Sequence, residues 1–151
     1  MRLDAVGFDS KLFKLGYRNS DAIFLDLALR LLKPGGRLVC LLPHAIIANV
    51  EYQRLRMAIE EEWNIIAVIG LPEGVFYLTA DTTTRADIVT LCRRGVRESP
   101  VQKVVFSHAP SVGIPLNSRD ATFTGNALQE IVANREIRAL LGLVGTRGDR
   151  R

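Results

Sequence analysis

The stretch SDAIFLDLALRLLKPGGRLVCLLP, residues 20–43, predicts a helix, a tight turn and a buried strand. Ser20 is a good N-cap, and Pro34 with the two glycines after it ends the helix, because proline cannot continue a helix and glycine tolerates positive φ. The apolar run at 38–42 is typical of a strand that is covered on both faces. Helical spacing predicts one buried face, formed by Ile23, Phe24, Leu27, Ala28 and Leu31. This order of elements is half of a parallel α/β unit.

The rest of the chain continues the alternation of helices and strands. Helices are expected at about 50–62 and from residue 125 onward, and strands at 65–71, 88–93 and 101–106. Loops are expected at 44–49, 77–85 and 108–123. We expect the strands near 37–42 and 65–70 to be parallel neighbours joined by a right-handed crossover. The strand at 88–93 should be antiparallel to its predecessor, because no helix separates the two.

Two blocks of this sequence resemble the adenine-N6 DNA methyltransferases, and most closely the modification subunits of type I restriction-modification systems. The first is LALRLLKPGGRLVCLLP at 27–43. The second is IIAVIGLPEGVF at 65–76, followed by a Thr-rich loop and the strand ADIVTLCRRG at 86–95. The resemblance implies an α/β fold: a partial Rossmann-like S-adenosylmethionine-dependent methyltransferase fold, with the last three strands of the sheet and their flanking helices.

Two motifs of that family are missing. The chain has no GxG, the core of the glycine-rich loop that binds S-adenosylmethionine, and no Asn precedes a Pro, as the Asn-Pro-Pro-aromatic motif requires. By resemblance, the chain starts just after the catalytic motif. The family transfers a methyl group from S-adenosylmethionine to adenine in DNA; we expect no activity and no tight cofactor binding from this chain alone. We expect an irregular arm at 1–19, the C-terminal half of the catalytic domain at 20–142 and a flexible basic tail at 143–151.

The resemblance also suggests site residues, none of them catalytic. Phe76 would stack on the flipped target adenine, with Tyr77 as an alternative, and Phe24 and Pro43 would lie against the cofactor. Contacts to DNA are expected from Thr82, Thr83, Thr84, Arg85, Arg93 and Arg94. Each has a structural alternative: Phe76 as a loop anchor, Phe24 as a core residue, the threonines as a solvated loop. Asp87 argues against DNA contact here, because a carboxylate repels phosphate.

Composition and charge limit the remaining possibilities. The net charge of +4 and the pI of about 9.4 permit contact with nucleic acid. Cys40 and Cys92 have no metal-ligand spacing and are expected to be buried reduced thiols. His44 and His108 look isolated, so surface or capping roles are expected, and no metal site is predicted. The absence of a signal or membrane segment suggests a cytoplasmic protein.

A half sheet would leave the strand at 38–42 with an unpaired edge. We expect this edge to be covered in a homodimer or by a partner that carries the missing half; double-stranded DNA and a specificity subunit are further partners implied by the resemblance. The alternatives to a methyltransferase part are a non-catalytic interaction module, a relic fragment, and a methyltransferase of RNA or small molecules. The block at 65–76 and its Thr-rich loop disfavour the last.

Overall fold

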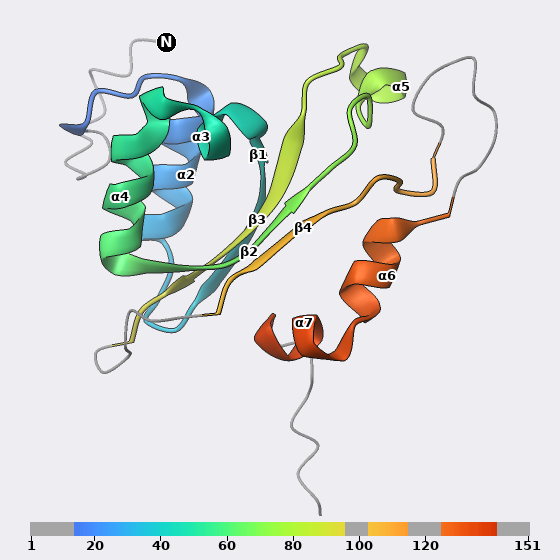
Figure 1. Ribbon diagram of the computed structural model, residues 1–151. Helices are drawn as coiled ribbons and strands as arrows, with labels where there is room; N and C mark the ends of the chain where they lie inside the picture. Colours follow the sequence, from blue (N-terminus) through green and yellow to red (C-terminus); the bar gives the residue numbers. More distant parts are fainter. Residues whose placement is uncertain (1–13, 96–102, 115–124, 142–151) are drawn as a thin grey trace, which may run out of the picture.

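The computed structural model describes residues 14–95, 103–114 and 125–141 (Figure 1). Its elements are α2 (Ser20–Arg30), β1 (Arg37–Pro43), α3 (His44–Ala48), η2 (Val50–Tyr52), α4 (Gln53–Glu62), β2 (Trp63–Gly70), α5 (Tyr77–Ala80), β3 (Ala86–Arg93), β4 (Val105–His108), α6 (Ala127–Ala133) and α7 (Arg135–Leu140). The mixed α/β fold class is confirmed. The expected basic tail, and the expected arm up to residue 13, lie outside the described residues.

The four strands form one sheet in the order β1-β3-β2-β4. β3 is antiparallel to both of its neighbours, and β4 is parallel to β2. β1 and β2 therefore run in the same direction, as expected, but the expectation that they are neighbours is wrong. β3 turns back after β2, pairs with it, and offers its other edge to β1.

The core lies between one face of the sheet and the helices α2, α3 and α4, with α6 and α7 on the opposite side (Figure 1). Paired residues of β1 and β3, such as Leu38 with Leu91 and Cys40 with Val89, point to this core. The largest fully buried side chains are Leu25, Leu29, Ile46, Leu55 and Leu91. On the opposite side, the Arg37 guanidinium donates a hydrogen bond to the carbonyl of Leu140 at the end of α7.

Helix α2 buries a different face from the one expected. Its buried residues are Ala22, Leu25, Asp26 and Leu29. Three residues of the expected core face are exposed: Phe24 by 56%, Leu27 by 41% and Leu31 by 77%. The helix is apolar on more than one side, so its spacing alone does not determine which side meets the sheet. Ser20 is the first helical residue, and Asn19 takes the N-cap position without a side-chain hydrogen bond.

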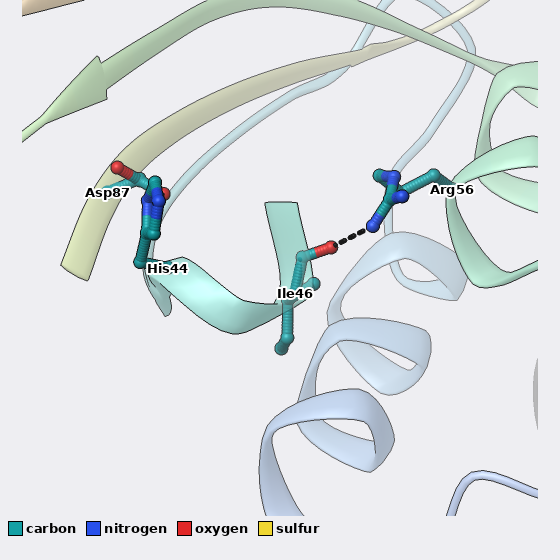
Figure 2. Close-up of polar contacts among 4 residues, drawn as sticks. All are labelled: His44, Ile46, Arg56 and Asp87. Carbon is teal, nitrogen blue, oxygen red and sulfur yellow. Dashed lines mark hydrogen bonds and ion pairs between the residues drawn. The ribbon is translucent and has the colours of Figure 1, made fainter. Parts of the chain in front are cut away.

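A short helix, α3, occupies part of the expected loop at 44–49. Arg56 on α4 holds its far end, because Nη1 donates to the carbonyl of Ile46 at 2.8 Å (Figure 2). The same atom donates to the carbonyl of Asn49 at 2.9 Å. This contact fixes α3 against α4 and so fixes His44, the first residue of α3. Within the described ranges, no helix is long and apolar enough to cross a membrane.

Candidate functional site

Three strands that run in the same direction end at one edge of the sheet. His44 directly follows β1, Gly70 ends β2 and His108 ends β4. Asp87, near the start of the antiparallel β3, pairs in register with Gly70, which in turn pairs with His108. In open α/β sheets, ligands bind outside this carboxyl edge. The strand ends thus bring two histidines and a carboxylate to the position where a ligand is expected.

His44 and Asp87 form a hydrogen-bonded pair. The Nδ1 atom of His44 lies 2.9 Å from Oδ2 of Asp87 (Figure 2). The Asp87 side chain is only 4% exposed, whereas that of His44 is 47% exposed. An ionised carboxylate only accepts hydrogen bonds, so Nδ1 of His44 carries the proton. The pair supplies the partner that a buried carboxylate needs.

A cavity of about 300 Å³ lies in front of this pair. It is lined by His44, Gly70, Pro72, Asp87, His108 and Pro110, among others. Its floor is open because residue 70 has no side chain: a Cβ there would lie 3.1 Å from Nδ1 of His108 and 3.3 Å from Oδ1 of Asp87. At the rim, Arg85 and Glu73 form an ion pair at 2.9 Å.

This cluster was not predicted from the sequence. His44 and His108 look isolated there, and Asp87 looks only like an obstacle to DNA contact, but His44 and Asp87, 43 residues apart, are partners. A usable signal was present, because His44 comes shortly after the strand predicted at 38–42, Asp87 directly before the one at 88–93 and His108 shortly after the one at 101–106. Strand ends that share an edge of a sheet bring such residues together.

The Thr-rich loop and Phe76 lie beyond the same edge of the sheet. Phe76 is half-buried at the N-cap position of α5. The loop is ordered by its own side chains, since the hydroxyls of Thr82 and Thr84 lie 2.8 Å apart. Thr83 and Arg85 are exposed. Stacking by Phe76 and DNA contact by Thr82, Thr83, Thr84 and Arg85 stay predictions.

Arg93 and Arg94 lie at the opposite end of the sheet from Arg85. Arg93 ends β3, and its guanidinium donates to the carbonyl of Leu32 after α2. Arg94 donates to Oδ1 of Asn64, at 2.7 Å, and to backbone carbonyls at the end of α4. A strand of eight residues spans about 25 Å. The six proposed DNA contacts therefore divide between two ends of the molecule. All three arginines have partners: Arg85 pairs with Glu73, and Arg93 and Arg94 donate to oxygens of the fold.

The two candidate cofactor contacts are also separated. Phe24 is exposed on the outer side of α2, and Pro43 is half-buried between β1 and α3. Neither residue lines the cavity in front of Asp87. Two further cavities lie beside α4 and are both lined in part by Phe106, and neither Phe24 nor Pro43 lines them. Contact of Phe24 and Pro43 with S-adenosylmethionine stays a prediction. No group of three or more potential metal ligands occurs among the described residues.

Comparisons with known proteins give one family. The N-6 DNA methylase family model matches residues 10–136. A comparison with curated proteins gives no match. Among solved structures, the chain is similar to a candidate class I S-adenosylmethionine-dependent methyltransferase from Listeria monocytogenes, with 25% identity and a TM-score of 0.55, over 78% of this chain and 32% of that one.

Two further structures belong to type I restriction-modification systems. A modification subunit of a candidate type I restriction enzyme from Vibrio vulnificus is 20% identical, with a TM-score of 0.49, over 75% of this chain and 25% of that one. A chain from a structure of type I restriction-modification complex assembly is 19% identical, with a TM-score of 0.46, over 58% and 18%. The chain thus spans about a third or less of the structures it matches. With the family match extending over most of its length, the chain belongs to the N-6 DNA methylase family.

Proposed function

We propose that this chain is the C-terminal part of the catalytic domain of a DNA adenine-N6 methyltransferase of a type I-like restriction-modification system. The observation that carries the proposal is the N-6 DNA methylase match over residues 10–136. The mixed sheet supports it, because its fold matches a class I methyltransferase structure over 78% of this chain. The substrate would be adenine in double-stranded DNA and the methyl donor S-adenosylmethionine.

Methyl transfer by this chain requires the rest of the catalytic sheet. A methyltransferase works by holding donor and acceptor in line, and such positioning accounts for much of its rate. The glycine-rich loop and the Asn-Pro-Pro-aromatic motif that would hold them are not in this sequence. We call the part of an N-6 DNA methylase that carries these two motifs the front part. It would be supplied by the same polypeptide or by a separate one.

The open edge of β1 is where the front part would join. β1 is an edge strand, and no described strand pairs with its outer side. Val39 and Leu41 on β1 are 65% and 52% exposed, and the adjacent α2 exposes Phe24, Leu27 and Leu31. Because side chains alternate along a strand and Leu38 and Cys40 face the core, Val39 and Leu41 lie on the face of the sheet opposite α2. The five residues thus flank the free edge from both faces, and we call them the apolar border. Apolar surface beside a free strand edge usually marks an interaction site, and burying it contributes about 25 cal/mol per Å² before the entropy cost of association.

The apolar border also favours a second candidate function, a non-catalytic interaction module. In that case, a second copy of this chain or a partner without methyltransferase motifs would cover β1. Such a complex would associate through the same residues but would leave DNA unmethylated, with or without the front part. A specificity subunit is a further partner in the methyltransferase proposal.

A methyl-transfer assay tests the proposal. The purified chain, with and without a front part, is incubated with adenine-containing duplex DNA and tritiated S-adenosylmethionine. We expect N6-methyladenine, identified by mass spectrometry of the digested DNA, only when both parts are present. By calorimetry, the chain alone should bind S-adenosylmethionine weakly or not at all. N6-methyladenine formed by the chain alone, or a micromolar dissociation constant for the cofactor, would show that this sequence contains a complete site.

A further inference from the structure

We propose that the outer edge of β4 binds an extended segment of a partner protein, which pairs with β4 as an added strand. One aliphatic and one basic side chain of this segment would occupy two cavities beside α4. The inference goes beyond the proposed function and does not depend on it. A front part that joins at β1 would leave β4 as an edge of the sheet.

β4 offers unpaired backbone groups. It forms the edge of the sheet opposite β1, and no described strand pairs with its outer side. The N–H of Ala109 donates to the carbonyl of Gly70, at 2.9 Å, so the backbone groups of residues 105, 107 and 109 face β2. By alternation, the N–H and the carbonyl of Phe106 face outward, and no described residue bonds to them. Such groups are a template for another strand.

Two cavities lie on the α4 side of this edge, and Glu60 and Phe106 line both of them. The first, of about 260 Å³, is lined mainly by aliphatic side chains between α4 and the sheet, among them Ile59 and Leu91. The second, of about 360 Å³, is lined in part by Trp63 at the start of β2. Phe106 is 71% exposed, so both cavities reach the outer edge of β4. Protein interiors rarely leave such spaces unfilled.

The spacing of the two cavities suits an added strand. Residues i and i+2 of a strand lie on the same face, about 6.6 Å apart. Because the two cavities share Glu60, Ile65 and Phe106, they are neighbours, and one strand can place a side chain in each. The backbone of the segment would bond to β4, and these two side chains would give the specificity.

The cavities differ in the side chain that they suit. The first takes an aliphatic side chain because its walls are mostly aliphatic. In the second, the carboxylate of Glu60 is exposed and has no partner among the described residues, and the rings of Trp63 and Phe106 suit a cation. Arg94 also lines the second cavity, but its guanidinium donates to Asn64 and to backbone carbonyls at the end of α4. A Lys or Arg of the segment would therefore pair with Glu60.

Size and charge favour a segment of another protein over a second copy of this chain. β4 has four residues, and a stable dimer buries about 800 Å² on each partner, more than an edge of this length offers. In a second copy, Val104, Phe106 and His108 share one face of the strand, so that face brings no Lys or Arg to Glu60.

The test uses the full chain and a phage-displayed library of random decapeptides. We expect enrichment of peptides that carry Leu, Ile or Val two positions from Lys or Arg. Trp63 is the only tryptophan of the sequence, so a synthetic enriched peptide without tryptophan should shift its fluorescence on binding. No enrichment, or enrichment of Asp or Glu at the basic position, would overturn the proposal.

Variants locate the binding site. Phe106→Pro removes the outward N–H but no donor to β2, and should bind the peptide at least tenfold more weakly than Phe106→Ala, which keeps that N–H. Glu60→Lys should reverse the preference for Arg over Glu in the peptide. Val50→Lys, at a position that is 80% exposed, should bind like the wild type. Equal affinities of Phe106→Pro and Phe106→Ala, with unchanged circular dichroism spectra, would contradict strand addition.

N-methylated peptides give the same test without altering the chain. Methylation of one alternate set of amides should abolish binding and methylation of the other set should not, whereas equal effects of the two sets would count against an added strand. A wild-type dimer in light scattering that Phe106→Pro converts to a monomer would assign the edge to a second copy. Competition between the peptide and the front part would assign it to the front part, and either result would overturn the proposal. Peptide binding is measured without DNA or S-adenosylmethionine, so its outcome is independent of the methyl-transfer assay.

Discussion

At the scale of single residues, buried polar groups take their roles from partners far away in the sequence. Asp87 is held by His44 across 43 residues. Arg94 joins the end of α4 to Asn64 on β2 and so serves the fold at the end of the sheet away from the cavity. Charge alone does not separate these roles, since Arg85 and Arg94 look alike in the sequence. The partners that each guanidinium finds decide whether it is available to a ligand.

Arg94→Ala should lower the free energy of unfolding by about 1–3 kcal/mol, because it leaves the buried Oδ1 of Asn64 and two carbonyls of α4 without their donor. Arg54→Ala, at an exposed position on α4, should change it by less than about 0.5 kcal/mol. Urea denaturation followed by circular dichroism measures both. Equal effects of the two substitutions would mean that the Arg94 contacts contribute nothing to stability.

Cys40 should react slowly in the native protein. Burial raises the pKa of its thiol to about 11, and the thiolate is the form that reacts. At pH 8, iodoacetamide should therefore label Cys40 at least about tenfold more slowly in the native chain than in urea, with the rate rising as the pH approaches 11. The raised pKa also means that the native state holds this proton more tightly, so its contribution to stability is present below about pH 8.5 and is lost as the pH rises toward 11. Peptide mass spectrometry follows the labelling, and equal rates in both states would contradict the burial of this thiol.

At the scale of elements, α2 and β1 share one property: each is apolar on the side that the core does not use. α2 buries Leu25 and Leu29 but also exposes Leu31, and β1 buries Leu42 but exposes Val39 and Leu41. An element that is apolar on both sides is typical of the interior of a larger structure. The pattern supports a role for this chain as part of a more extended sheet.

The orientation of α2 can be tested directly. Leu25→Ala should lower the free energy of unfolding by about 2–5 kcal/mol, because Leu25 is fully buried. Leu31→Ala should cost less than about 0.5 kcal/mol in the isolated chain, because Leu31 is 77% exposed. Thermal or urea unfolding of both variants gives the comparison. A larger loss for Leu31→Ala than for Leu25→Ala would mean that α2 buries the face that the spacing predicted.

Substitutions on β1 should weaken association. Val39→Lys or Leu41→Lys places a charge on the apolar border, whereas Gln53→Lys changes an exposed polar position on α4. Light scattering should show a larger loss of self-association, or of binding to the front part, for the β1 variants. A well-folded wild-type monomer at high concentration that also fails to bind the front part would remove the apolar border as an interface.

An element can be predicted from the sequence where local signals determine it, and cannot where contacts between distant segments do. Pro34, Gly35, Gly36 and the spacing of the apolar residues predict the helix–turn–strand order at 20–43, because these signals are local in the sequence. The spacing did not predict which face of α2 is buried, because a helix that is apolar on more than one side has no single preferred face. The sequence also does not predict that β3 lies between β1 and β2, because pairing between distant segments determines which strands are neighbours in a sheet. The His44–Asp87 pair depended on that same pairing and was missed with it.

At the scale of the whole molecule, the chain has a core and an open edge. The family match covers most of its residues, while the chain itself covers 18–32% of the structures to which it is similar. The core packs under α2, α3 and α4, and among the described strands β1 is one of the two edges of the sheet, with the apolar border beside it. We therefore propose β1 as the junction with the rest of the catalytic domain.

Hydrogen–deuterium exchange of this chain, alone and with the front part, tests the junction most directly. The outward-facing amides of β1 should exchange quickly in the isolated chain, because no described strand accepts their hydrogen bonds. With the front part bound, we expect protection of Arg37–Pro43 and of the outer side of α2, together with the appearance of N6-methyladenine in added DNA. Binding of the front part with no change in the exchange of β1 would contradict the account.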